Sequence, residues 1–419
     1  MSNKYNWKNI IIISVGVLLG ISLRIYFLWM DGYSTDIYDV YCWFKKINDS
    51  GFWSLYSAGY QESTTNYPPI IPIVGSLWFR IPMVIKAISI DSLFFKILPT
   101  IFELALTIFS IFIIVKSKIN GNYKNLLISF VILQPGLAFV SSGWGQFDSV
   151  VSLFIFVAIY MLWKDKLFLS TFIFYLATLT KPQAALAVFT YFAYLAIKKQ
   201  YKNLLIQAIF FLFLMLATAL IFKICGNSNF FGPYLVAVDF MTVVSVGSFN
   251  LWWTIFAINS YSISDSSFKL AGLSMFLISI IPALIYLRRK KTNLPEIMLV
   301  FGYIFLAFFI LPTQVHERYL YYGVAMISIA SIINYKFFIL YIILSINLFL
   351  NCAIVLRSNY PHQLSAFPNL HSNVTTTIAF INLLVFVSLF LHFWFKINNK
   401  RSFFDNDKKI DLEKIYPKT

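Results

Sequence analysis

Four short polar clusters interrupt an otherwise apolar chain, and their side chains are of types that perform acid–base chemistry and bind anions. They are Asp36 with Tyr67-Pro68-Pro69, Trp144-Gly145-Gln146-Phe147-Asp148, Lys181-Pro182-Gln183 and His316-Glu317-Arg318. Ionisable residues at membrane depth are costly and usually mark function. A carboxylate combined with several cationic groups indicates chemistry on a negatively charged substrate.

Asp36 is the candidate for a general base. It follows the first apolar run by a few residues. A carboxylate partly shielded from water at a membrane face can be tuned to accept a proton from a sugar hydroxyl. An ordinary solvated loop acid is the alternative interpretation. Asp39 lies about one helical turn later, so it could share this role or take it over.

The aromatic residues of the first two clusters are candidates for substrate contact. Trp144 could stack on a sugar face, and Gln146 or Asp148 could hydrogen-bond sugar hydroxyls, with glycines allowing a sharp turn there. An interfacial tryptophan followed by a capping aspartate is the alternative. Tyr67 begins a rigid aromatic–proline elbow, which is compatible with a substrate contact or with a simple helix break.

The cationic residues of the last two clusters are candidates for holding a phosphate. Lys181 breaks the expected charge asymmetry of the loops, and a phosphate partner would explain it; a snorkelling lysine is the alternative. His316 and Arg318 open a helix, whose start favours anions, although Glu317 and Arg318 could form a purely structural pair. Gln183 is a further candidate for substrate contact. No second His or Cys stands at ligand spacing from His316, so we expect no metal.

Asn250 and Trp252 belong to a fifth segment, Phe249-Asn250-Leu251-Trp252-Trp253. An interfacial aromatic belt is one interpretation of this segment. Contact with an acceptor or a lipid is the other, and on that basis both residues are candidates for substrate binding.

The composition places these clusters in a polytopic membrane protein. Of 419 residues, 59% are hydrophobic and only 12% are charged, far from the composition of a soluble domain. Twelve apolar runs are long enough to be helical spans. Their ranges are 9–30, 93–115, 125–141, 149–163, 167–180, 184–197, 203–223, 268–287, 295–312, 319–334, 337–356 and 375–395. The sequence therefore predicts an all-α bundle of about 12 transmembrane helices.

The basic residues predict how this bundle is oriented. Most of the 33 Lys and Arg residues lie in loops on one side and in the C-terminal tail, which the positive-inside rule assigns to the cytoplasm. All four clusters then face outside, beside external loops at about 31–92, 225–266 and 357–374. The segment 68–86 is apolar enough to be an extra span, but its four prolines favour a re-entrant or interfacial segment. If it did span, this orientation would fail.

Two units follow from this organisation. Residues 1–395 form one transmembrane domain, in which the loop 31–92 carries the candidate base, and residues 396–419 form a charged cytoplasmic tail. The net charge of +16 fits membrane orientation better than nucleic-acid binding. No Gly-rich phosphate loop is present for a nucleotide sugar, and we expect no cofactor. The donor of any transferred group must then come from the membrane.

Taken in order, the clusters resemble those of the GT-C superfamily of glycosyltransferases that use polyprenyl-phosphate sugars. The likeness is greatest to prokaryotic relatives of the GPI mannosyltransferase II family, and dolichyl-phosphate-glucose-dependent enzymes are similar too. It rests on Asp36, Tyr67-Pro68-Pro69, Gly143 to Ser149, Lys181-Pro182-Gln183, Asn250-Leu251-Trp252 and His316-Glu317-Arg318-Tyr319. The resemblance implies that the acid of the first external loop, Asp36, is the catalytic base of an inverting transfer.

These observations predict a hexosyltransferase of the outer membrane face. It would move mannose or glucose from a polyprenyl-phosphate sugar to a lipid-linked or cell-surface glycan. The membrane would be the cytoplasmic membrane, or the endoplasmic reticulum in a eukaryote. A lipid or polysaccharide flippase or transporter is the alternative, although such proteins bind near the midplane, often within repeated halves, and no repeat is visible here.

Overall fold

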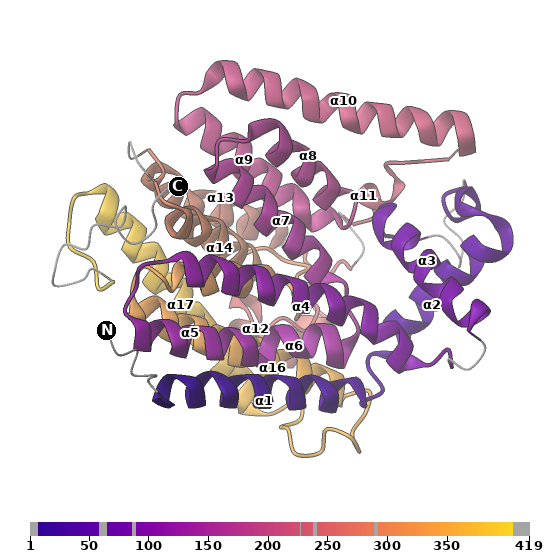
Figure 1. Ribbon diagram of the computed structural model, residues 1–419, viewed down its shortest axis with the longest axis horizontal. Coiled ribbons are helices and arrows are strands. Elements are labelled where there is room, and N and C mark those ends of the chain that lie inside the picture. The colour runs from indigo at the N-terminus through magenta and orange to yellow at the C-terminus, as the bar shows by residue number, and fades with distance from the viewer. Residues whose placement is uncertain are drawn as a thin grey trace.

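The computed structural model is built from helices throughout the residues that it describes, which are 7–57, 65–85, 89–226, 228–237, 241–288 and 292–404. Figure 1 shows their arrangement. The elements run α1 (Trp7–Leu28), α2 (Ser34–Ser50), η1 (Phe52–Leu55), α3 (Ile70–Val84), α4 (Ser92–Lys116), α5 (Gly121–Leu133), α6 (Pro135–Ala138), η2 (Phe139–Trp144), α7 (Asp148–Trp163), α8 (Leu167–Thr178), η3 (Pro182–Ala184), α9 (Ala185–Ile197), α10 (Tyr201–Gly226), α11 (Gly232–Val236), α12 (Leu251–Phe256), η4 (Ala257–Tyr261), α13 (Lys269–Tyr286), α14 (Leu294–Ile310), α15 (Leu320–Ala330), α16 (Tyr335–Arg357) and α17 (Asn373–Ile397).

The fold is that of an all-α polytopic membrane protein, as the hydropathy predicted. Eleven of the twelve expected spans each coincide with one helix, and the span expected at 125–141 is divided among α5, α6 and η2. Among the described residues, 7 helical segments are long and apolar enough to cross a membrane by length and composition. The other five expected spans are shorter apolar helices of 10–17 residues, and so is Ile70–Pro82.

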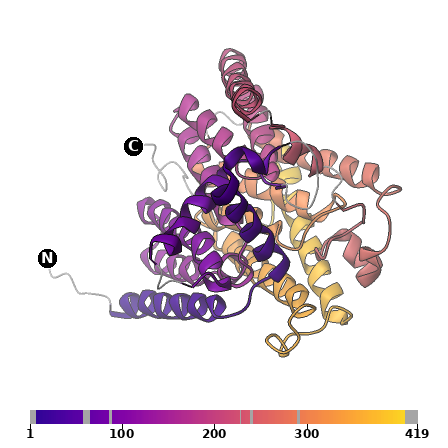
Figure 2. The ribbon, with the colours of Figure 1, turned by 90° about the vertical axis from the view of Figure 1, so that its right-hand side faces the viewer.

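Burial separates a central helix pair from a peripheral helix. α14 and α15 pack against each other, and nearly all of their side chains are buried. By contrast, only 6% of the most apolar window of α10 is buried, and α10 lies along the outer edge of the bundle (Figures 1 and 2). An apolar helix with so little protein contact is stable where lipid surrounds it.

The segment expected to be the first external loop contains α2, η1 and α3 at one end of the bundle, and α2 and α3 lie in front of the other helices in Figure 2. The apolar segment 68–86 becomes α3, and α3 packs against α2. Gly75 provides the close contact, because a Cβ there would lie 1.7 Å from the Phe44 ring. Ile73, Leu77 and Val84 remain exposed on α3.

A buried ion pair joins the helices behind the loop. Arg24 of α1 donates from Nε and Nη2 to Glu103 of α4 at 2.8 and 2.7 Å. Gln134 donates to Glu103 at 2.8 Å and accepts from Tyr341 at 2.9 Å. Charges in a membrane interior need such partners. The pair fixes the direction of α1, and thereby the point where the chain turns toward Asp36.

The loop between α10 and α13 enters the bundle and is held there by asparagines of the last two spans. Asn351 accepts from Phe249 N at 2.9 Å and donates to Gly247 O at 2.7 Å. Asn382 donates to Phe249 O at 3.0 Å. Irregular backbone at membrane depth requires internal partners of this kind. The same loop pairs with the His316 segment, because Val246 N donates to Val315 O at 3.0 Å.

The beginning of the predicted tail is packed against the bundle. Phe404 is buried and stacks on Phe337 at 4.7 Å between ring centroids. Asn334 donates to Phe404 O at 2.8 Å, and His392 pairs with Ser402. The rest of the expected tail, 405–419, lies outside the described residues.

Candidate active site

A cavity of about 320 Å³ collects side chains from segments that are far apart in the sequence. Its walls come from the start of α2, the chain before α3, the turn between η2 and α7, the start of η3, the loop between α10 and α13, the chain before α15 and one residue of α16. The lining residues are Tyr33, Thr35, Asp36, Asp39, Val40, Trp43, Asn66, Tyr67, Trp144, Gln146, Lys181, Pro182, Gln183, Val236, Ala237, Met241, Val246, Tyr261, Gln314, His316, Glu317, Arg318, Tyr319 and Val355.

Eight of the eleven residues expected from the sequence line this cavity. They are Asp36, Tyr67, Trp144, Gln146, Lys181, Gln183, His316 and Arg318. Asp148, Asn250 and Trp252 do not line it. Asp148 is fully buried behind the wall, where it contacts two of the lining cations. The clusters predicted to share one membrane face therefore share one cavity.

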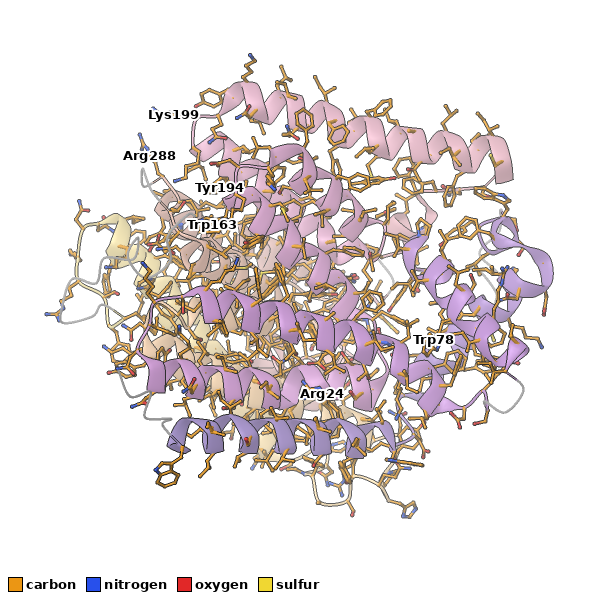
Figure 3. All side chains as sticks on the ribbon, in the orientation of Figure 1. Arg24, Trp78, Trp163, Tyr194, Lys199 and Arg288 are labelled. Atoms are coloured by element: carbon orange, nitrogen blue, oxygen red, sulfur yellow. The ribbon has the colours of Figure 1, made fainter. Side chains whose placement is uncertain are left out.

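The cavity lies at the opposite end of the bundle helices from the lysine-rich loops. α7 begins at Asp148 beside the cavity and ends before Lys164, and α9 leads from η3 to Lys198. In Figure 3, Lys199 and Arg288 lie at the end of the molecule opposite Trp78 of α3. The cavity thus stands where the chain leaves the bundle for α2 and α3.

Asp36 lies in the first turn of α2, where the helix dipole favours a negative charge. Its Oδ2 accepts hydrogen bonds from Trp144 Nε1 at 2.8 Å and from Gln146 Nε2 at 2.5 Å. Oδ1 has no hydrogen-bond partner among the described residues. One oxygen is thus fixed to the wall, and the other is available for a ligand.

A local distortion of the helix brings Trp144 to Asp36. η2 is a short π-helix, a form that recurs at functional sites. Gly145 follows the last residue of η2, Trp144, and its left-handed conformation, with φ of 94°, suits glycine. Trp144 O accepts from Tyr33 N at 3.1 Å, and the two rings stack with centroids 5.0 Å apart. The turn therefore fixes both the indole and the start of α2.

Gln146 connects Asp36 to the cationic side of the cavity. Its Oε1 accepts from Tyr67 Oη at 2.8 Å and from Lys181 Nζ at 3.0 Å. Because a lysine ammonium can only donate, the amide oxygen must face Lys181 and the amide nitrogen must face Asp36. The orientation of the Gln146 amide is therefore determined by its neighbours.

Lys181 forms a buried ion pair with Asp148. Its Nζ lies 3.0 Å from Asp148 Oδ1, which also accepts from Tyr322. Burial lowers the pKa of Lys181, and the attraction of Asp148 offsets only part of this effect. The position results from Thr180 and Lys181 leaving the helix after α8, while Pro182 starts the turn η3.

Arg318 is shared between two carboxylates and the cavity. Its Nη1 lies 2.6 Å from Glu317 Oε1, and its Nε lies 3.9 Å from Asp148 Oδ2, too far for a hydrogen bond. Both Nε and Oδ2 lack hydrogen-bond partners. Burial lowers the pKa of Arg318, but the negative charges of Glu317 and then Asp36 raise this pKa by more than burial lowers it. The guanidinium therefore stays charged. Its Cζ lies 5.8 Å from the Trp144 ring centroid.

The two remaining acids of the cavity behave differently. Burial would raise the pKa of Glu317, but Arg318 and His316 outweigh it and hold this pKa at about 2. Asp39 lies at the rim of the cavity, where partial loss of water and the charge of Asp36 raise its pKa. Glu317 is therefore an ion-pair partner, and Asp39 is the acid that binds its proton more firmly.

Several lining residues gave no signal in the sequence. Asn66 stands before the proline elbow, and its Oδ1 is buried without a partner. Gln314 adopts φ of 62°, a conformation that is uncommon for residues other than glycine and often occurs at functional sites. The order Asn66-Tyr67-Pro68 could have suggested the first residue, but nothing in the sequence predicts the conformation of Gln314.

Asn250 and Trp252 do not line the cavity. They stabilise the loop between α10 and α13 instead. Asn250 caps α12 by accepting from Trp252 N and Trp253 N at 3.1 and 3.2 Å. The Trp252 indole donates to Leu311 O at 2.9 Å. These contacts attach the loop to the end of α14, just before the His316 segment.

Within the described part of the chain, no group of three or more His, Cys, Asp and Glu side chains is placed to hold a metal ion. The polar groups that line the cavity are carboxylates, amides, hydroxyls, an ammonium, a guanidinium and an imidazole.

The chain matches no known family model and no curated protein. Among solved structures it is similar to the apo oligosaccharyltransferase of Archaeoglobus fulgidus, with 13% identity and a TM-score of 0.46. It is also similar to oligosaccharyltransferase AglB of A. fulgidus in complex with an inhibitory peptide and a dolichol-phosphate, with 14% identity and a TM-score of 0.45. Each match covers 97% of this chain and 57% of the other. Because these identities and TM-scores are low, the functional proposal rests on the residues of the cavity.

Proposed function

We propose that this protein is a GT-C-type glycosyltransferase that moves a hexose from a polyprenyl-phosphate sugar to a glycan acceptor. The observation that carries the proposal is the shared cavity of Asp36 and Arg318. Asp36 offers one unoccupied carboxylate oxygen, while Arg318 offers a charged guanidinium whose Nη2 makes no hydrogen bond to a described residue. A base for a hydroxyl and a cation for a phosphate are the two groups that this transfer needs.

The proposed reaction is a single displacement. Asp36 Oδ1 accepts the proton of an acceptor hydroxyl while that oxygen attacks the anomeric carbon. The bond from this carbon to the phosphate oxygen breaks, and the electron pair leaves with the polyprenyl phosphate. Phosphate is a good leaving group, so it needs cations rather than a general acid. One displacement inverts the anomeric configuration, unlike the double displacement of retaining glycosidases.

The surrounding residues have roles that follow from their places. Arg318 and His316 bind the donor phosphate at the start of α15. Trp144 supports the wall beside Asp36, because its ring stacks on Tyr33 and its Nε1 donates to Asp36. Tyr67 and Gln183 complete the wall near the sugar. Mannose and glucose are the expected hexoses, and the order of the motifs supports a relationship to the GPI mannosyltransferase II relatives.

The proposed location is the outer face of the cytoplasmic membrane, or the endoplasmic reticulum in a eukaryote. The cavity stands at the end of the bundle away from the lysine-rich loops, which supports this side. A lipid-linked or cell-surface glycan would then be the acceptor. A flippase would need a binding site reaching the midplane, and the terminal position of this cavity disfavours that alternative.

The test uses purified protein reconstituted in liposomes with two alternative donors. Polyprenyl-phosphate mannose or glucose should support transfer to a lipid-linked oligosaccharide, while the matching nucleotide sugars should not. Transfer from the nucleotide sugar alone would refute the proposal. Movement of the lipid donor between leaflets without any transfer would favour the flippase.

A further inference from the structure

Lys181 was expected to bind a phosphate, but its ammonium is already occupied by the protein. It lies 3.0 Å from Gln146 Oε1 and 3.0 Å from Asp148 Oδ1. Its Nζ also lies 5.0 Å from the centroid of the Tyr67 ring. The residue is 2% exposed. An ammonium has three donors, and two are hydrogen-bonded while an aromatic face lies close to the same nitrogen.

Arg318 differs from Lys181 in this respect. Its Nη1 is paired with Glu317, and its Nε is buried 3.9 Å from Asp148 Oδ2 without a hydrogen bond, but its Nη2 makes no hydrogen bond to a described residue. A guanidinium nitrogen without a protein partner can donate a charge-assisted hydrogen bond to a phosphate. Arg318 can therefore bind the donor without breaking its internal contact, whereas Lys181 would have to leave Asp148 or Gln146.

From this contrast we infer that Lys181 and Gln146 are positioning residues that hold the base, rather than ligands of the substrate. The chain of contacts runs from Asp148 to Lys181, from Lys181 to the oxygen of Gln146, and from the nitrogen of Gln146 to Asp36. The inference rests on the proposed function, because it assigns roles within the same site.

Lys181 acts on Asp36 through the side-chain amide of Gln146, whose oxygen and nitrogen contact the two residues separately. While Lys181 holds Oε1, only the Nε2 end of Gln146 can face Asp36, and it donates to Oδ2. Without Lys181 the amide can rotate and present its oxygen to the carboxylate, which repels it. Asp148 would also lose its close cation. Asp36 would then lose one of two donors that fix its orientation toward the acceptor.

The two assignments predict different kinetics. A phosphate ligand binds the donor, so its removal raises the KM for the donor. A positioning residue for the base acts in the chemical step, so its removal lowers kcat and leaves the donor KM nearly unchanged. We expect Lys181→Met and Gln146→Leu each to lower kcat by about 10- to 100-fold. Their combination should cost little more than either alone, because they act in one chain.

Gln146→Glu gives a second readout that does not depend on removing Lys181. The new carboxylate can still accept from Lys181 and Tyr67, but its other oxygen faces Asp36. A like charge raises the pKa of a neighbouring carboxylate. The acidic limb of the pH profile of kcat/KM should therefore move to higher pH by about one unit or more. Gln207→Leu is the matched control, because Gln207 is a buried glutamine that accepts from Thr171 far from the cavity.

The experiment measures transfer against donor concentration and pH for these variants, together with the binding of polyprenyl phosphate by thermal shift. The inference is supported if Lys181→Met has a lowered kcat with an unchanged donor KM. It is also supported if Gln146→Glu moves the acidic limb of the pH profile of kcat/KM to higher pH. A tenfold rise in donor KM with normal kcat for Lys181→Met would overturn it. A wild-type acidic limb in the pH profile of Gln146→Glu would overturn it as well. If Lys181→Met does not fold, Gln146→Glu decides.

The binding arm separates this inference from the proposed function. If the wild-type protein transfers no sugar, the proposed function fails. Thermal shift would still report whether polyprenyl phosphate stabilises Lys181→Met but not Arg318→Gln, which is the contrast that the inference requires. Loss of stabilisation in both variants would assign Lys181 to the phosphate site and refute it.

Discussion

The hydrogen bonds on Asp36 divide its two oxygens into one that is held and one that can react. Trp144 and Gln146 both donate to Oδ2, so the carboxylate cannot turn without losing two contacts. A base held in this way needs little reorganisation when the acceptor arrives. Asp39, three residues later, has no comparable pair of donors among the described residues, and its pKa is raised by partial burial and by the charge of Asp36.

Arg318 allows the phosphate assignment to be tested directly. Arg318→Ala should raise the donor KM by about 10- to 100-fold, because a charge-assisted hydrogen bond contributes roughly 1.5–3 kcal/mol. Arg318→Lys should restore donor use only in part, since the forked geometry is lost. The measurement is the transfer rate as a function of donor concentration. Unchanged donor dependence in Arg318→Ala would leave Arg318 as a structural partner of Glu317.

Glu317 makes a prediction about acid stability. Its pKa in the folded protein is about 2, below the ordinary value near 4.3 for glutamate. Its contribution to folding is therefore fully present above about pH 4.3 and is lost as the pH falls toward 2. Glu317→Gln should flatten the fall of the thermal unfolding midpoint between about pH 4.3 and 2. A slope equal to that of the wild type would contradict this account.

The sequence signal for each candidate site residue was a polar side chain at the edge of an apolar run. Asp36, Trp144 and Arg318 were found in this way, and all three line the cavity. Asp148 has the same signal, yet it is buried behind the wall as a partner of Lys181. Packing between helices that are distant in the sequence decides whether an acid lines the cavity or pairs with a buried cation. The local sequence around the acid does not contain that information.

At the scale of elements, the last two spans support the site through backbone contacts. Asn351 holds Gly247 and Phe249, and the neighbouring Val246 pairs with the segment that carries His316. The resemblance by motifs ended before these spans, and their asparagines gave no functional signal. Their role depends on a loop that enters the bundle, which hydropathy cannot predict. By contrast, the spans themselves follow from apolar length and were predicted.

Asn351→Leu tests this support. The substitution leaves Gly247 O and Phe249 N without their partner in a buried place, which costs about 1–3 kcal/mol for each group. We expect a lower thermal unfolding midpoint in detergent. We also expect weaker donor use, because the loop that pairs with the His316 segment is no longer held in place. Asn398→Leu, at an exposed helix end, is the control and should change neither. A wild-type midpoint for Asn351→Leu would refute the supporting role.

At the scale of the whole molecule, the account requires the cavity and the lysine-rich loops to face opposite sides of the membrane. Single cysteines at the exposed positions Thr35, Asp49 and His362 should be labelled from outside intact cells. Cysteines at the exposed positions Lys199 and Arg288 should be labelled only after permeabilisation. The native exposed Cys225 is first replaced. Labelling of Thr35 and Lys199 from the same side would contradict the orientation.

The central claim is that Asp36 is the base of a glycosyl transfer, and one comparison tests it most directly. Sugar transfer from a polyprenyl-phosphate donor is measured for the wild type, Asp36→Asn and Asp39→Asn, each shown to be folded. The account predicts that Asp36→Asn loses about 10²- to 10⁴-fold in rate, while Asp39→Asn keeps most of its activity. Near-normal transfer by Asp36→Asn, with Asp39→Asn inactive, would contradict it and move the role to Asp39.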